Sequence, residues 1–184
     1  KVVKQDHKTL PFSKLTVKGV FPVVISQDGG PEWVKIEADE NLQELITTQN
    51  YGDELIISSD DNLTIRRAKK LKVYVNVKNL SEFENASVGS ITSSGTLRFD
   101  SLLIESESVG KLELTLQGNF MRANLNSLGV TTLAGNVNEV RINNKSVGAL
   151  HAYDLKAQTL MIHNTAVGVV EVFADKEFHI RSSG

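Results

Sequence analysis

Five tripeptides of one type, a small residue followed by an aliphatic residue and a glycine, decide the fold: Ser87-Val88-Gly89, Ser108-Val109-Gly110, Ser127-Leu128-Gly129, Ser146-Val147-Gly148 and Ala166-Val167-Gly168. Their glycines follow one another at intervals of 21, 19, 19 and 20 residues. Such a period is too short for two helices and a loop, and helical apolar patterning does not run through these segments. The repeat therefore predicts strands.

Each repeat carries two stretches in which apolar and polar residues alternate. Leu102 and Ile104 precede Gly110, and Leu112 and Leu114 follow it. Residues that tolerate tight turns separate the two stretches: Gly95, Gly118, Gly135, Asp154 and Asp175. Copies stacked in register, about 4.8 Å apart, bury each half-covered face against the next. The pattern predicts an all-β chain folded as a parallel β-helix, or β-solenoid, with about 20 residues per rung.

The chain, residues 1–184, is interpreted as one β-helix domain. Residues 81–184 hold the regular repeats, and residues 1–80 are expected to form irregular capping rungs that shield the open end of the stack. All three prolines lie in the first 31 residues, which suits strands in the remainder. Within the cap we expect strands over 15–17, 23–25, 34–36, 55–57 and 71–77, one helical turn within 39–46, and turns at 27–31 and 50–53.

Composition excludes several classes of protein. The 20 basic and 22 acidic side chains are spread without runs, so we expect no nucleic-acid partner and no polybasic membrane anchor. The chain has no cysteine, which excludes disulfides and thiolate chemistry, and no apolar stretch approaches the roughly 20 residues of a spanning helix. The sequence begins with Lys1 and breaks off within a repeat, so we expect a processed chain whose export signal and short tail lie outside it.

The aliphatic residue before each glycine forms a first column through the stack. Its members are Val88, Val109, Leu128, Val147 and Val167. Branched apolar residues at a fixed phase are typical of a pleated interior. We expect this column to be buried in the core.

A second column lies four places before each glycine and contains Asn85, Ser106, Leu125, Asn144 and Asn164, with Ser182 in phase beyond them. Alternation turns this column inward, where an unpaired amide costs about 1–3 kcal/mol. We expect the asparagines and serines to form a structural ladder, bonded to one another or to the turn backbone, although Leu125 interrupts it. Asn85 and Asn144 also begin Asn-x-Ser glycosylation patterns, which require exposure; we interpret both as structural.

A third column, five places before each glycine, points outward and changes from acidic to basic: Glu84, Glu105, Asn124, Asn143, His163 and Arg181. A column two places earlier behaves similarly: Glu82, Leu103, Arg122, Arg141, Met161 and His179. One interpretation is a flat surface that binds a glycan or a protein strand. The other is a solvated face stabilised by cross-rung pairs such as Glu105 with Arg122.

Signs of catalysis are few. Nucleophile-elbow, phosphate-loop, zinc-protease and dinucleotide motifs do not occur. The acidic run 60–62 lacks the spaced ligands of a calcium loop, and the stacking phase separates the carboxylates between 100 and 113 around the rung. His151 lies beside Glu171 on the next rung, and we interpret this pair as structural. We therefore predict no catalytic residues, no metal site and no cofactor.

Four segments carry a resemblance to a known family: FSKLTVKGVFPVVISQ (12–27), VKIEADENLQELI (34–46), LKVYVNVKNLSEFENASVGSITSSGTL (71–97) and LHAYDLKAQTLMIHNTAVG (150–168). They resemble the family "putative auto-transporter adhesin, head GIN domain". Its turns typically read Ser-Gly-Ala-Ser, whereas those here keep the glycine but are more apolar. The resemblance implies a pectin-lyase-like β-helix, export in Gram-negative bacteria to the periplasm, outer membrane or cell surface, and a role in cell adhesion. It carries no catalytic residues over to this chain.

Two classes of function follow from these observations. The first is a non-enzymatic envelope or surface protein that binds a glycan or protein partner along a solenoid face. The second is a polysaccharide-active enzyme, a lyase or hydrolase, on the same scaffold. A lipid- or small-ligand-binding envelope module is a third possibility.

Overall fold

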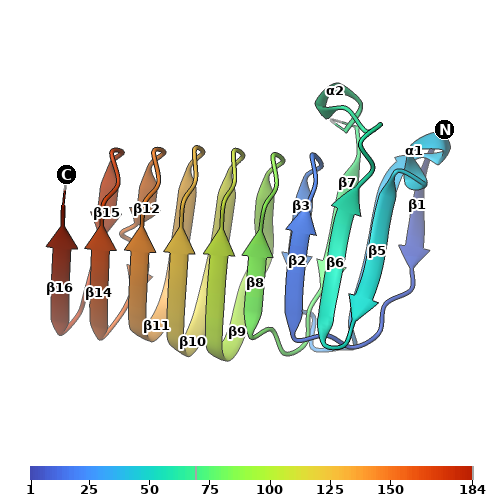
Figure 1. Ribbon diagram of the computed structural model, residues 1–184. Helices are drawn as coiled ribbons and strands as arrows, with labels where there is room; N and C mark the ends of the chain where they lie inside the picture. The colour runs from blue at the N-terminus through green and yellow to red at the C-terminus, as the bar shows by residue number, and fades with distance from the viewer. Residues whose placement is uncertain (69, 184) are drawn as a thin grey trace.

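The computed structural model describes residues 1–68 and 70–183 and confirms the predicted parallel β-solenoid (Figure 1). The repeat region contains β8 (Glu82–Asn85), β9 (Ile91–Ser106), β10 (Leu112–Leu125), β11 (Thr131–Asn144), β12 (Leu150–Ala152), β13 (Leu155–Lys156), β14 (Thr159–Asn164), β15 (Val170–Val172) and β16 (Glu177–Ser182). The preceding elements are β1 (Val2–His7), β2 (Lys14–Lys18), β3 (Val23–Ser26), β4 (Trp33–Asp39), α1 (Glu40–Gln43), β5 (Ile46–Tyr51), β6 (Glu54–Ser59), α2 (Ile65–Ala68) and β7 (Lys72–Asn76).

Successive repeats lie in the register that the glycine spacing predicts. On both sides of β10 the pairing is parallel, and Met121 lies beside Leu102 of β9 and Val140 of β11. All three side chains are buried, as are Leu112 and Ile142 in neighbouring columns. The apolar columns therefore form one continuous core along the stack.

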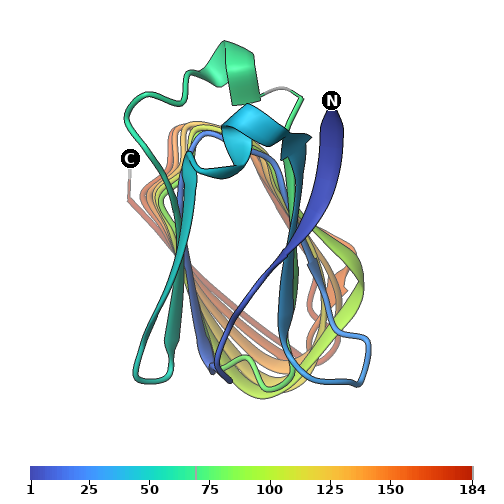
Figure 2. The same cartoon turned by 90° about the vertical axis from the view of Figure 1, so that its right-hand side faces the viewer.

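The rungs wind between two parallel walls. We call one wall the front sheet: β5, β6, β2 and β8, then the second halves of β9, β10 and β11, and finally β14 and β16. The back sheet contains β1, β4, β7 and β3, the first halves of β9 to β11, and β12 and β15. Seen along the stack, the rungs overlay as one flattened outline (Figure 2). The front sheet thus presents one regular outer face.

The predicted second turn is a separate turn only in the last rungs. Gly95, Gly118 and Gly135 lie inside the long strands β9, β10 and β11, which continue through this region; the β9–β10 register shifts beside Gly95, whereas Gly118 and Gly135 stay paired. Gly135 has a φ of 116°, which favours glycine, and a Cβ at this position would overlap the carbonyl oxygen of Leu116. Continuous pairing explains why the corner does not end the strand. At Asp154 the chain turns between β12 and β13.

The prediction that the aliphatic column is buried is wrong. Leu128 is 63% exposed, whereas Ser127 beside it is 1% exposed; the other exposed members of the column are Val88, Val109, Val147 and Val167. These residues lie in the turn between the two walls, where the serine points inward to hydrogen-bond and the glycine packs against the rung before it. The residue between them therefore projects into solvent. We call this exposed aliphatic line the turn ridge.

The amino-terminal strands depart from the parallel pattern. β1 pairs antiparallel with β4, β4 with β7, and β5 with β6. β1 and α1 lie at the near end of the stack in Figure 2, and the buried Gln43 of α1 donates to the carbonyl oxygens of Val3 and Ile36. The five strands and the helical turn expected in residues 1–80 coincide with β2, β3, β4, β6, β7 and α1. Sequence reasoning missed β1, β5 and α2.

Candidate functional site

The outward column forms a line across the front sheet. Glu84 lies beside Glu105, Glu105 beside Asn124, and the register continues through Asn143 and His163 to Arg181. The column two places earlier runs parallel to it, from Lys14 and Glu82 through Arg122 and Arg141 to His179. The structure therefore brings all six predicted binding residues onto one face, with a second polar column alongside.

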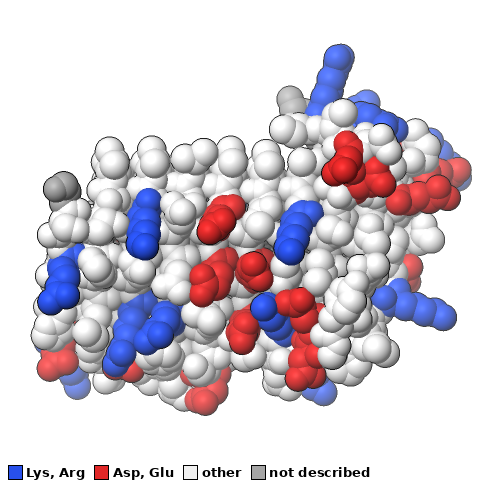
Figure 3. All heavy atoms as spheres, in the orientation of Figure 1, with Lys and Arg blue, Asp and Glu red and all other residues white. Residues whose placement is uncertain are grey.

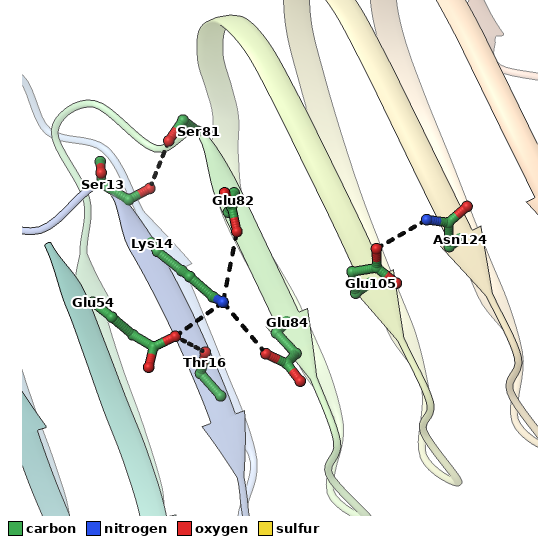
Figure 4. A network of polar contacts seen from close by, with 9 residues as sticks. All are labelled: Ser13, Lys14, Thr16, Glu54, Ser81, Glu82, Glu84, Glu105 and Asn124. Carbon is green, nitrogen blue, oxygen red and sulfur yellow. Dashed lines mark hydrogen bonds and ion pairs between the residues drawn. The ribbon is translucent and has the colours of Figure 1, made fainter. Parts of the chain in front are cut away.

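In the acidic half of this face, one lysine offsets part of the charge of three carboxylates. Lys14 on β2 places its Nζ 3.1 Å from a carboxylate oxygen of Glu54, 3.6 Å from one of Glu82 and 3.7 Å from one of Glu84 (Figure 4). The hydrogen bond with Glu54, with the attraction of all three carboxylates, raises the pKa of Lys14 above its usual 10.5, although partial burial opposes the shift. One lysine thus binds together three strands, β6, β2 and β8.

The next rung in the same column is also satisfied. Asn124 Nδ2 donates to Glu105 Oε1 over 2.9 Å (Figure 4). The cross-rung pair expected between Glu105 and Arg122 is therefore replaced by a bond to the residue directly opposite Glu105 in the register. The carboxylates of the acidic half are thus already engaged by the protein's own donors.

The carboxyl-terminal half of the front sheet is cationic. In Figure 3 the blue side chains gather at the lower left of the face, over the last rungs, while red ones lie near its centre. A hollow of about 620 Å³ opens there, and we call it the cationic hollow. The lining residues that matter below are Arg122, Arg141, Met161, His163, His179 and Arg181. Within residues 1–68 and 70–183, none of the residues that line it is acidic.

Two neighbouring side chains contact Arg141 in the hollow. Its Nη2 lies 3.5 Å from a carboxylate oxygen of Glu139, and its guanidinium stacks over the ring of Phe120, 5.8 Å from the ring centre. Two buried atoms at this point, Arg141 Nε and Asn143 Oδ1, have no hydrogen-bond partner in the described part of the chain. Buried polar atoms are normally paired, so the sheet is not optimised here for its own stability.

The residues of the predicted ladder lie inside the solenoid, away from this face. Asn85 Nδ2 donates to Ser106 Oγ over 3.3 Å, and Asn144 Nδ2 donates to Asn164 Oδ1 over 3.1 Å. Asn85, Asn144 and Asn164 also accept bonds from turn N–H groups two residues on. The side chains of Asn85 and Asn144 are buried, which is inconsistent with carrying a glycan in the folded state.

The back sheet holds the remaining candidate pair. His151 Nδ1 lies 3.1 Å from Glu171 Oε1, and both side chains are about half exposed. In the described residues, no three His, Cys, Asp or Glu side chains come together as a metal site would require. Among those residues, too, no helix has the length and apolar character needed to cross a membrane.

Sequence reasoning gave the outward column but did not commit to Arg122, Arg141 and His179 as binding residues. These three side chains face the same way, two positions earlier on each strand, and complete the cationic hollow. The signal was present, since side chains at i and i+2 share one face of a strand. Weighing the two columns together would have identified the hollow.

Several solved structures share this fold. A protein described as a putative adhesin from Bacteroides fragilis shares 21% identity at a TM-score of 0.85, over 99% of this chain and 96% of that one. A putative lipid binding protein from Parabacteroides distasonis shares 18% identity at a TM-score of 0.63, over 100% and 94%. A putative adhesin from the same species shares 19% identity at a TM-score of 0.60, over 99% of this chain and 96% of that one. At these identities the likeness establishes the fold.

Family membership rests on the sequence itself. No curated protein matches the chain. Residues 11–184, however, match the family described as "Putative auto-transporter adhesin, head GIN domain", and this range contains β2 to β16. The chain therefore belongs to this family, which is defined by its head GIN domain.

Proposed function

We propose that this protein is an exported, non-enzymatic surface protein that binds a glycan along its front sheet. Its family indicates a surface, adhesin-like role. The observation that carries the proposal is the regular outer face, where a polar side chain lies at the equivalent position of each rung. The recurrence of about 4.8 Å is close to the length of one hexose in an extended chain, so successive sugars would meet equivalent positions.

A binding role is favoured over catalysis by the state of the carboxylates. Glycoside hydrolysis requires two carboxyl groups that face one substrate bond. Here Glu54, Glu82 and Glu84 surround Lys14, and Glu105 accepts a bond from Asn124. Groups already engaged in this way are poorly placed to move protons in a substrate.

The test is a glycan array probed with the whole chain, run beside assays for new reducing ends and unsaturated uronates. We expect binding without product. Asn124→Tyr, which places a ring in the middle of the front sheet, should abolish binding, whereas Thr132→Tyr on the back sheet should not. Product formation would establish the enzyme instead. Binding that Thr132→Tyr abolishes and Asn124→Tyr does not would assign the site to the other wall.

Lipid binding is a second candidate because one observation favours it. The turn ridge exposes a line of aliphatic side chains, and one protein of the same fold is described as a putative lipid binding protein. Exposed apolar lines of this kind can mark a contact surface. Co-flotation with phosphatidylglycerol vesicles tests it, with Val109→Ser/Leu128→Ser as the ridge variant. Flotation that the ridge variant loses would support this candidate, and its absence would leave the glycan proposal in place.

A further inference from the structure

The cationic hollow carries charge that the fold does not balance. Arg122 and Arg141 lie directly opposite each other on β10 and β11, and His163 lies opposite Arg181 on β14 and β16. The two arginines carry like charges, which destabilise a sheet when they lie directly opposite each other. In the acidic half Lys14 offsets the same problem, whereas the ion pair at the hollow in the described residues is the one between Arg141 and Glu139. The unbalanced charge indicates an anionic partner.

The spacing of the cations selects an extended polyanion. Arg122, Arg141, His163 and Arg181 come from four consecutive rungs, so one basic side chain recurs at each step of about 4.8 Å along the stack. A compact anion such as phosphate would engage one or two of them. A chain with one charge per sugar, running along the solenoid axis, would engage all four.

The hollow also offers what a sugar ring needs besides charge. Met161 lies between Arg141 and His179 in the register, and its side chain is 41% exposed. A thioether there can pack against the carbon-bound hydrogens of a pyranose ring. Asn143 can offer an amide to a ring hydroxyl if its side chain turns, which would also give its unpartnered Oδ1 a bond. Stacking on Phe120 orients the guanidinium of Arg141 on this face before a ligand binds.

We propose that the cationic hollow binds an anionic glycan, whose carboxylate or sulfate groups lie rung by rung against Arg122, Arg141, His163 and Arg181. This inference rests on the proposed function and names the chemical class of the ligand. Because the bonds are charge-assisted and exposed, binding should weaken steeply with added salt.

Calorimetric titration of the whole chain tests the proposal with four probes: a de-esterified oligogalacturonate, its methyl ester of the same length, a heparin oligosaccharide and a poly-glutamate peptide. The variant is Arg122→Gln/Arg141→Gln. Its control is Lys18→Gln/Lys156→Gln, which removes the same charge at two exposed lysines away from the hollow. We expect one acidic saccharide to bind, the arginine variant to lose about tenfold or more in affinity, and the control to lose less than about twofold. Oligogalacturonate carries carboxylates alone and heparin carries carboxylates and sulfates, so binding of heparin without oligogalacturonate would indicate that sulfate is required.

Each other result is decisive. Equal binding of the methyl ester, or of a neutral glycan alone, overturns the anionic class while leaving the proposed function intact. Binding of poly-glutamate alone overturns both in favour of an acidic protein partner, and binding of no saccharide on this panel or the array overturns both as well. Thermal unfolding of the arginine variant should occur near the wild-type temperature, because loss of the like-charge contact offsets loss of the Arg141 contacts with Glu139 and Phe120. Affinity can therefore be read on a folded protein.

Discussion

The backbone N–H of Ser127 donates to Ser146 Oγ on the following rung over 3.0 Å. Leu125 interrupts the column of asparagines and serines inside the solenoid, and Ser127 carries the hydrogen-bond network past it. On its other side Ser127 Oγ lies 3.5 Å from Ser106 Oγ. The interior network is therefore continuous although the column in the sequence is not, and each of its members should matter for stability.

Asn144→Leu should lower the free energy of unfolding by about 1–3 kcal/mol. The change removes the acceptor of the Ser146 N–H and the donor to Asn164 Oδ1. Leu125 occupies the same column one rung earlier and is buried, so a leucine fits the space and the loss isolates the hydrogen bonds. Urea titration measures it; a value within about 0.5 kcal/mol of wild type would show that the ladder is dispensable.

Gly129→Ala should destabilise the solenoid by about 1–3 kcal/mol or more. The glycine packs so closely on the preceding rung that a Cβ would overlap the carbonyl oxygens of Val109 and Gly110, which are backbone atoms and cannot rotate away. Urea titration beside Leu128→Ala, in the same turn, separates the close approach from a general effect of mutating the turn. Equal, small effects of both changes would contradict the stacking of the turns.

Leu128→Ala should change the free energy of unfolding by less than about 1 kcal/mol, whereas Leu112→Ala should cost about 2–5 kcal/mol. Leu128 is exposed on the turn ridge, and Leu112 is fully buried between Ile91 and Thr131 in the back sheet. Both changes remove the same atoms, so the difference measures burial alone. Comparable losses in urea would mean that another molecule or segment covers the ridge.

The repeat region could be predicted because the same glycine and the same alternation of apolar and polar residues recur in each rung. Once the glycines set the phase, the alternation around Leu112 and Ile142 determined which side chains face inward. The turns escaped this rule, because alternation holds only while the chain is extended; Leu128 follows an inward serine but lies where the chain reverses. β1 was missed because its alternation is weak, and its partner β4 is settled only by tertiary contact.

The position of the candidate site could be predicted from the sequence, but the pairing of its charged side chains could not. The sequence placed Glu105 and Arg181 on one face because the period gives their register. It could not indicate that Lys14, seventy residues before Glu84, pairs with the carboxylates of the acidic half, because β2 lies between β6 and β8 only in the folded chain. Which charged side chains of this face are paired therefore depends on the tertiary arrangement of the strands.

Trp33 should report the titration of Asp28. The indole Nε1 donates to Asp28 Oδ2 over 3.0 Å, and this bond, with a second from the Gly30 N–H, lowers the pKa of Asp28 below its usual 3.8. A lowered pKa stabilises the fold at pH above 3.8 and stops doing so as the pH falls through the folded value. Since Trp33 is the single tryptophan, its fluorescence should change with a midpoint below 3.8. Asp28→Asn, which does not titrate, should remove that step; a midpoint at or above 3.8 would contradict the bond.

Lys14→Met should destabilise the protein at pH 7 by about 1 kcal/mol, because Glu54, Glu82 and Glu84 then face one another across three strands without a cation. Because the pKa of Lys14 is raised above 10.5 in the folded state, the stability that this lysine contributes is complete below pH 10.5 and is lost as the pH rises through its pKa in the folded protein. The stability of the wild type should therefore fall above pH 10.5, and that of the variant should not share this fall. At about pH 4, where glutamates begin to take up protons, the variant should recover toward wild type. Lys111→Met is the matched control, since its pair with Glu113 is half exposed on both sides and joins no strands. Urea titrations of both variants at about pH 4, at pH 7 and above pH 10.5 measure the free energy of unfolding. We expect the pH-dependent change for Lys14→Met but not for Lys111→Met. Equal losses of unfolding free energy at pH 7 would mean that the three-strand cluster contributes no more than an ordinary surface pair.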